Sequence, residues 1–160
     1  MPDCQLYLIS PADVSGTFAD RLACAIDAAD PALPVAAFQL RLKGLDQHAC
    51  ARAAEPLQKI CAARDVAFIV NDDVSLAKRI GADGVHLGQG DGSPRDARAI
   101  LGADAQIGGT CHASRHLAME AGDGGADYVA FGSFYPSSTK VSEHRPELDL
   151  LHWWHGLMEI

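Results

Sequence analysis

The chain has 160 residues, a formal net charge of −8 and 48% hydrophobic residues, a composition typical of one soluble globular domain. It contains no basic tract, so we expect neither a nucleic acid nor an anionic membrane as a partner. The N-terminus has no signal-peptide pattern, and no run approaches the roughly 18 apolar residues of a membrane helix. We therefore predict a cytoplasmic protein.

The five cysteines, at positions 4, 24, 50, 61 and 111, are odd in number and widely spaced, with no C-x-x-C pair. This pattern predicts reduced thiols. Cys111 precedes His112, and such a pair can serve nucleophilic catalysis. Adjacent residues of a strand point to opposite faces, however, so we expect Cys111 to be a packed thiol.

Short apolar runs alternate with helical patterns along the whole chain. The expected strands cover residues 5–10, 37–42, 66–71, 84–88, 106–111 and 128–132. The expected helices cover residues 17–30, 47–64, 74–80, 94–101, 114–121 and 147–159, with Ser93 as a cap before Pro94. Six consecutive βα units with apolar strands predict an α/β fold with a parallel sheet and right-handed crossovers.

Polar residues stand at or just after the ends of several expected strands: Gln39, Arg41 and Lys43; Asn71 and Asp72; His86, Gln89 and Asp91; Thr110 and His112; and residues 137–140. In a barrel these ends meet at one mouth, whereas in an open doubly wound sheet they lie along one edge. We favour a TIM (β/α)8-type barrel forming a single domain over residues 1–160. That domain is incomplete, because about six βα units fit where an eight-stranded barrel needs roughly 200 residues or more.

The expected mouth combines two carboxylates, Asp72 and Asp91, with three cations, Arg41, Lys43 and Lys140. Mg²⁺ takes one or two carboxylates together with water and substrate phosphate. Arg binds phosphate oxygens through its planar fork and Lys binds them as a point charge. The set predicts a site for a diphosphate–Mg²⁺ leaving group on a small-molecule substrate.

Each of these residues also has a structural interpretation. Asp72 could cap the helix that follows, and Asp91 could be a turn residue in Gly90-Asp91-Gly92. Arg41 and Lys43 alternate in the expected strand and could be solvated, and Lys140 could be a surface lysine. Their shared placement after successive strands favours the functional interpretation. For His86, in an apolar strand, we expect a hydrogen-bonded core histidine rather than a ligand.

Four linked motifs span most of the chain: Gln39-Leu-Arg-Leu-Lys43, Phe68-Ile-Val-Asn-Asp-Asp-Val74, Gly81-Ala-Asp-Gly-Val-His-Leu-Gly-Gln-Gly-Asp91, and Gly125-Ala-Asp-Tyr-Val129 with Gly132-Ser-Phe-Tyr-Pro-Ser-Ser-Thr-Lys140. In order and spacing, from about Leu6 to Trp154, they resemble the signatures of the thiamine-phosphate synthase family. The resemblance implies a transferase that joins a hydroxymethylpyrimidine diphosphate to a thiazole phosphate and releases diphosphate.

The resemblance also implies roles for individual residues. It implies Mg²⁺ on Asp72 and Asp91. Diphosphate contacts are implied for Arg41, Lys43, Asn71 and Lys140, with Arg41, Lys43 and Lys140 as the catalytic cations. Further implied substrate contacts are Gln39 near the pyrimidine, Thr110 where the family usually has Ser, and Ser137 and Thr139 near the thiazole phosphate.

The chain departs from the family pattern at three points. Gly90 replaces a residue that is usually Glu, and Ser137 stands where Thr is common. The sequence ends at Ile160, where the family continues into its last two βα units. Two alternatives therefore remain: a thiazole tautomerase of the same fold, or an inactive barrel fragment that binds thiamine precursors and whose open edges favour a homo-oligomer.

Overall fold

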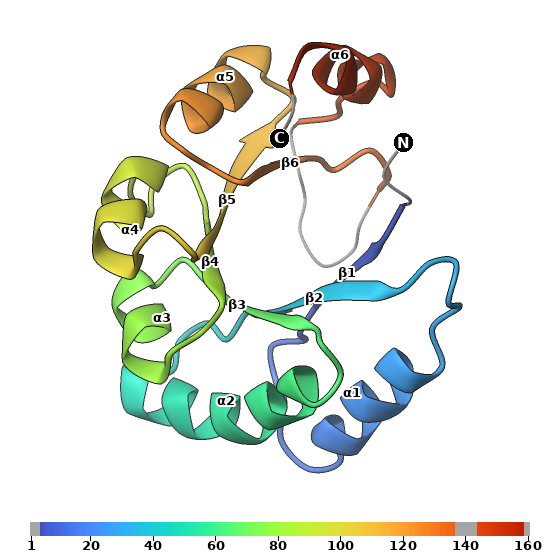
Figure 1. Cartoon of the computed structure of the whole chain (residues 1–160), viewed down its shortest axis with the longest axis vertical. Helices are drawn as coiled ribbons and strands as arrows, with labels where there is room; N and C mark the ends of the chain where they lie inside the picture. Colours follow the sequence, from blue (N-terminus) through green and yellow to red (C-terminus); the bar gives the residue numbers. More distant parts are fainter. Residues whose placement is uncertain (1–3, 137–143, 159–160) are drawn as a thin grey trace. The chain divides into compact units, whose positions relative to one another are not determined.

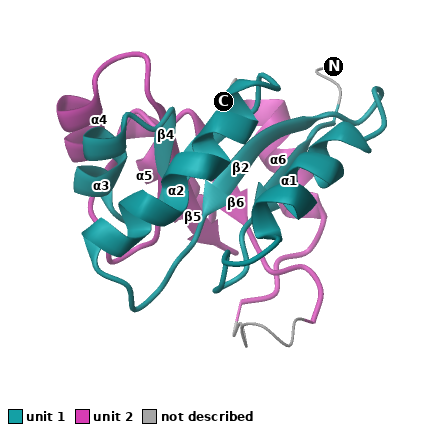
Figure 2. Ribbon diagram, turned by 90° about the horizontal axis from the view of Figure 1, so that it is seen from below, with its two compact units in different colours: residues 1–85 teal, residues 86–160 magenta. Residues whose placement is uncertain are grey.

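The computed structural model describes residues 4–136 and 144–158 and divides into two compact units, residues 1–85 and 86–160 (Figure 2). Unit 1 holds β1 (Leu6–Ile9), α1 (Phe18–Asp27), β2 (Val35–Leu40), α2 (Gln47–Ala62), β3 (Ala67–Asn71) and α3 (Val74–Ile80). β4 (Gly84–Leu87) contains the boundary between the units. Unit 2 continues with α4 (Pro94–Leu101), β5 (Gln106–His112), α5 (Arg115–Asp123), β6 (Tyr128–Phe131) and α6 (Asp149–Leu157).

The described strands follow the order β1-β2-β3-β4-β5-β6, so each is next to its neighbour in sequence. The pairs β1–β2, β2–β3 and β5–β6 are parallel. This confirms the expected α/β class with a parallel sheet. In the β5–β6 ladder the register shifts between Thr110 and His112, which leaves Cys111 as the extra residue of a bulge.

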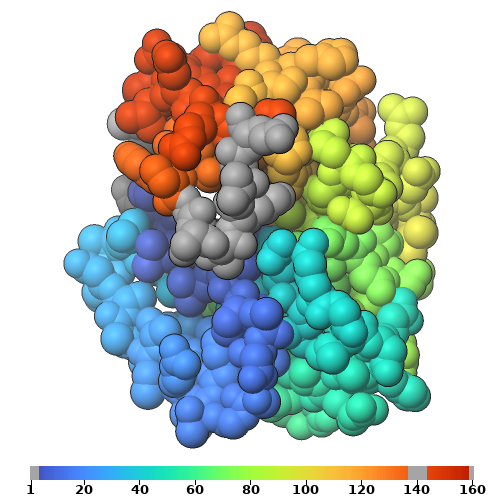
Figure 3. Space-filling view, turned by 180° about the vertical axis from the view of Figure 1, so that it is seen from behind, coloured from blue at the N-terminus to red at the C-terminus, as the bar shows by residue number. Residues whose placement is uncertain are grey.

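The helices of unit 1 lie on one side of its strands (Figure 1). Right-handed crossovers between strands in sequential order place every helix on the same face, whereas a doubly wound sheet needs a reversal of strand order to use both faces. α1 contacts α2, and both are at the surface of the unit (Figure 3). Between the helices and the strands, the ring of Phe38 packs against two other phenylalanine rings. Its centroid lies 6.2 Å from that of Phe18 and 5.8 Å from that of Phe68.

α2 shows why these segments are helical. It buries Cys50, Ala54, Leu57 and Cys61, which recur every three or four residues and therefore share one face. Its N-cap is Asp46, whose side chain accepts a hydrogen bond from the backbone N–H of Ala49 at 2.8 Å. No helix among residues 4–136 and 144–158 has both the length and the apolar character to cross a bilayer.

A Gly-Ala-Asp sequence precedes both β4 and β6 and has the same geometry in each unit. Gly81 and Gly125 have φ of 63° and 84°, the left-handed region that glycine adopts without strain. The aspartate that follows exchanges two hydrogen bonds with the start of the preceding strand. Asp83 N–H donates to Phe68 O at 3.0 Å and its carboxylate accepts from Phe68 N–H at 2.7 Å.

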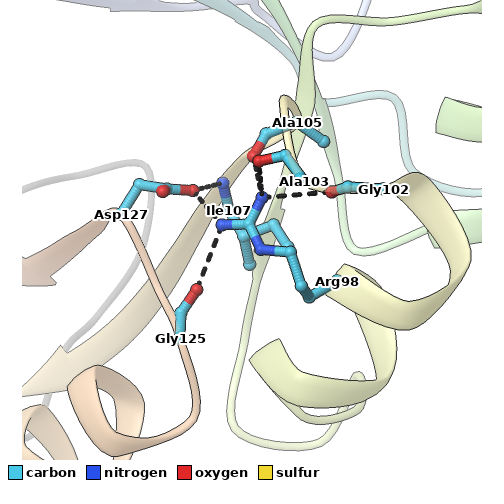
Figure 4. A network of polar contacts seen from close by, with 7 residues as sticks. All are labelled: Arg98, Gly102, Ala103, Ala105, Ile107, Gly125 and Asp127. Carbon is cyan, nitrogen blue, oxygen red and sulfur yellow. Dashed lines mark hydrogen bonds and ion pairs between the residues drawn. The ribbon is translucent and has the colours of Figure 1, made fainter.

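The second copy adds an arginine. Asp127 N–H donates to Ile107 O at 2.8 Å, and its carboxylate accepts from Ile107 N–H at 2.6 Å. Arg98 of α4 donates from Nη2 to the same carboxylate at 2.6 Å and to Gly125 O at 3.1 Å. Its Nη1 donates to carbonyl oxygens of the loop after α4, at Gly102, Ala103 and Ala105 (Figure 4). The motif therefore ties the amino ends of the strands together.

Candidate active site

The carboxyl end of β2 carries the first expected site residues. β2 ends at Leu40, two residues earlier than expected, so Arg41 and Lys43 lie in the loop after the strand and do not alternate within it. The physical reason is Ser10, whose Oγ accepts the Arg41 backbone N–H at 2.8 Å and so ends the ladder. Gln39 is buried within β2, and its Nε2 donates to Tyr7 Oη at 3.1 Å.

Two adjacent aspartates follow β3, and the structure separates their roles. Asp73 is the N-cap of α3: its carboxylate accepts from Leu76 N–H at 2.8 Å and from Gln47 Nε2 at 2.8 Å. The alternative interpretation of Asp72 as the cap is therefore wrong, since the chain places that role one residue later. Asp72 instead has φ of 65°, a left-handed conformation that a non-glycine residue adopts at a cost of about 1 kcal/mol or more.

Lys43 forms a long ion pair with Asp72. Its Nζ lies 4.0 Å from Asp72 Oδ2, and the two side chains are 62% and 32% exposed. An ion pair this long and this exposed contributes less than about 1 kcal/mol. The contact therefore does little to stabilise the fold by itself, and Asn71 at the last position of β3 precedes Asp72 in the chain.

In unit 2, Asp91 lies in the turn after β4. Its backbone N–H donates to Gly88 O at 3.2 Å, and the residue is exposed. The turn interpretation from Gly90-Asp91-Gly92 is thus correct for the backbone, and it leaves the carboxylate at the surface. Gln89 of the same turn donates from Nε2 to the carbonyl oxygen of Thr110, which connects the turn to β5.

His86 of β4 is buried and hydrogen-bonded, as expected. Its Nε2 lies 2.8 Å from Thr110 Oγ1 on β5, and its Nδ1 lies 3.2 Å from Tyr128 Oη on β6. Burial lowers the pKa of His86 to about 4, so the ring is neutral near pH 7. Sequence reasoning placed His86 among the polar residues of the expected mouth but missed Tyr128, for which the available signal was a polar Tyr in a strand of otherwise apolar residues.

Cys111 is a packed thiol, which confirms that expectation. It is fully buried against Ala118 and Trp154, and its Sγ donates to Gly109 O at 3.6 Å. Burial raises the pKa of Cys111 to about 11, so the thiolate needed for nucleophilic attack does not form near neutral pH. Its neighbour His112 packs instead against His144, with ring centroids 4.6 Å apart.

The comparisons with known proteins agree with the motifs. The family model described as thiamine monophosphate synthase matches residues 6–160. The chain belongs to this family. A thiamine-phosphate synthase of Erythrobacter litoralis is 63% identical over 98% of this chain and 73% of its own length. One from Rhodospirillum centenum is 53% identical over 100% of this chain and 76% of its own length.

A solved structure extends the likeness to three dimensions. The thiamine phosphate pyrophosphorylase from Pyrococcus furiosus superimposes with a TM-score of 0.71 at 27% identity. The match covers 87% of this chain and 64% of that protein, so the chain spans less than two thirds of the solved relative. Family membership confirms the resemblance and the transferase class, and it does not favour a tautomerase or an inactive fragment.

Ser137, Thr139 and Lys140 lie outside the described residues, so their placement stays a prediction. Within the described part of the chain, no three His, Cys, Asp or Glu side chains gather as metal ligands. Mg²⁺ does not need such a cluster, because it takes one or two carboxylates and completes its shell with water and phosphate oxygens. The hard oxygen donors of Asp72 and Asp91, both in loops after strands, therefore suit that ion.

Proposed function

We propose that the chain catalyses the thiamine-phosphate synthase reaction, in which a hydroxymethylpyrimidine diphosphate and a thiazole phosphate combine and diphosphate leaves. The observation that carries this proposal is the geometry of Asp72. Its backbone is left-handed directly after β3, and its carboxylate lies 4.0 Å from Lys43 Nζ. Asp73, not Asp72, caps the following helix. Conformations of this kind persist where the surroundings enforce them and are common at functional sites.

In the proposed reaction the protein neutralises the charge of the leaving diphosphate and aligns the two substrates. Acid–base catalysis is not required. Loss of diphosphate from the electron-rich pyrimidinylmethyl carbon leaves a stabilised cation, which the thiazole nitrogen attacks. Arg41 and Lys43 follow β2 and Asn71 ends β3, so these groups are assigned to the departing diphosphate. Mg²⁺, held by Asp72 and Asp91, would supply further neutralisation of diphosphate charge.

The remaining assignments follow the family pattern. Gln39 is assigned to the pyrimidine, Thr110 to substrate binding, Lys140 to the diphosphate, and Ser137 and Thr139 to the thiazole phosphate. We further propose that residues 1–160 belong to one (β/α)8-type barrel domain, supported by the single-sided helices of unit 1 and the Pyrococcus furiosus likeness. The five free cysteines suit the reducing cytoplasm, which is the proposed compartment.

The test is a coupling assay with both substrates that follows diphosphate release with and without Mg²⁺. We expect turnover that requires Mg²⁺ and a loss of at least about 100-fold in Asp91→Ala, since a charge-stabilising contact to the leaving group is removed. The matched control is Asp104→Ala, which removes an exposed carboxylate between α4 and β5. Full activity in Asp91→Ala would contradict the assigned site, and tautomerase turnover without diphosphate release would contradict the reaction.

A further inference from the structure

Three polar side chains from neighbouring strands form a hydrogen-bonded series inside unit 2. Tyr128 of β6 and Thr110 of β5 contact opposite nitrogens of the His86 ring, at 3.2 and 2.8 Å. His86 is 8% exposed, whereas Thr110 and Tyr128 are half-buried. The buried imidazole therefore links two hydroxyl groups, and one of them belongs to a proposed substrate-binding residue.

The positions of the two rings are set by packing. The Tyr128 ring stacks on the His86 ring with centroids 5.6 Å apart and an interplanar angle of 27°. A Cβ built at Gly108, two residues before Thr110, would overlap the Tyr128 ring. Glycine at position 108 is thus required for the tyrosine to reach His86 at all, and a larger side chain there would displace it.

The neutral state of His86 limits the hydrogen-bond pattern to two possibilities. A neutral imidazole has one N–H donor and one acceptor nitrogen, so one hydroxyl donates to the ring and the other accepts from it. A phenol is more acidic than an aliphatic alcohol and is the better donor. On this ground we assign Tyr128 as the donor to Nδ1, which places the ring hydrogen on Nε2 and makes Nε2–H the donor to Thr110 Oγ1.

With its oxygen accepting from His86, the Thr110 hydroxyl keeps its own hydrogen for another acceptor. Gln89 indicates which substrate lies next to Thr110. It donates to the Thr110 carbonyl oxygen and belongs to the same turn as Asp91. In the proposed function Asp91 binds the Mg²⁺–diphosphate group. The nearer substrate is therefore the pyrimidine diphosphate, which offers ring nitrogens and phosphate oxygens as acceptors.

We propose that Tyr128 and His86 are positioning residues that direct the Thr110 hydroxyl as a hydrogen-bond donor to the bound pyrimidine diphosphate. This inference rests on the proposed function for the identity of the ligand, while the tautomer of His86 is a property of the protein alone.

The first measurement is the tautomer of His86, by ¹⁵N NMR of the histidine-labelled protein, with His86→Asn used to assign the signal. We expect a neutral ring with hydrogen on Nε2 at pH 7, and a mixture of tautomers in Tyr128→Phe. The control Tyr135→Phe removes the hydroxyl of an exposed tyrosine and should leave the spectrum unchanged. A ring with hydrogen on Nδ1, or a protonated ring, would overturn the inference even if the enzyme is active.

The second measurement is kinetic and separates positioning from folding. We expect Thr110→Val and Tyr128→Phe each to raise KM for the pyrimidine diphosphate about five- to tenfold, the effect of one lost hydrogen bond, without raising KM for the thiazole phosphate. Thr110→Ser should restore the wild-type value. Adding Tyr128→Phe to Thr110→Val should have no further effect, because Tyr128 acts through Thr110; a further increase of the same size would overturn the inference.

Discussion

At the scale of single residues, Asp72 and Asp73 show how neighbours of the same type take different tasks. Asp73 accepts two hydrogen bonds of 2.8 Å, from Leu76 N–H and Gln47 Nε2, and so belongs to the scaffold. Asp72 has a left-handed backbone and lies near Lys43. Both carboxylates have the same chemistry, and the backbone geometry around each decides which of them caps the helix.

Substitutions at these two positions should separate activity from stability. Asp72→Asn keeps a residue type that tolerates positive φ, so we expect the free energy of unfolding to change by less than about 0.5 kcal/mol while Mg²⁺-dependent turnover falls at least about 100-fold. Asp73→Ala removes the cap and should lower the free energy of unfolding by about 1 kcal/mol. Urea denaturation and the coupling assay measure the two effects, and a greater stability loss in Asp72→Asn would contradict the assignment.

At the scale of secondary-structure elements, the two Gly-Ala-Asp sequences join consecutive strands at their amino ends. Each aspartate pairs with the backbone of the preceding strand, at Phe68 in unit 1 and Ile107 in unit 2. These motifs helped to identify the family from sequence, yet they lie at the ends of the strands opposite to the candidate site residues. Their role is to stabilise the fold, as expected for that face of parallel βα structures.

Arg98 provides the test of this scaffold. Arg98→Lys keeps the charge but loses the planar fork that reaches loop carbonyls and Asp127 together, so we expect the free energy of unfolding to fall by about 1–3 kcal/mol. Arg95→Lys, on the exposed face of the same helix, is the control and should change it by less than about 0.5 kcal/mol. Equal values for the two variants in urea denaturation would show that the network contributes little.

At the scale of the whole molecule, each compact unit carries site residues that are proposed from the family pattern. Asp72, Lys43 and Arg41 belong to unit 1, whereas Asp91 and Thr110 belong to unit 2. Each unit can be tested by itself, because a ligand that contacts a segment slows hydrogen exchange there: its contacts are lost when the segment opens.

Hydrogen–deuterium exchange tests this directly. With Mg²⁺ and diphosphate present, we expect protection of residues 71–73 and of residues 88–92, and at 100 times Kd a gain of about 2.7 kcal/mol in the free energy of unfolding. Removal of Mg²⁺ by EDTA should abolish both effects. Protection confined to one of the two segments would contradict the assignment of Mg²⁺ to both Asp72 and Asp91.

The sequence by itself determined the order of the six strands and six helices found in the described part of the chain, several helix starts and the family. Ser93 caps α4 before Pro94, as predicted, because capping depends on residues within one turn. The same holds for the helices, whose apolar periodicity is local. The motifs identified the family because they keep fixed spacings along the chain, whatever their contacts. Assignments of Ser137, Thr139 and Lys140 stay predictions.

Tertiary structure alone decided where β2 stops and which residues surround Thr110. The end of β2 depends on Ser10, 31 residues before Arg41, and the setting of Thr110 depends on His86 and on Tyr128. No local pattern encodes these pairs, because strands distant in sequence bring them within hydrogen-bonding distance only after the chain has folded. The sequence could name candidate groups, but the direction of a hydroxyl group depends on which partners the fold places beside it.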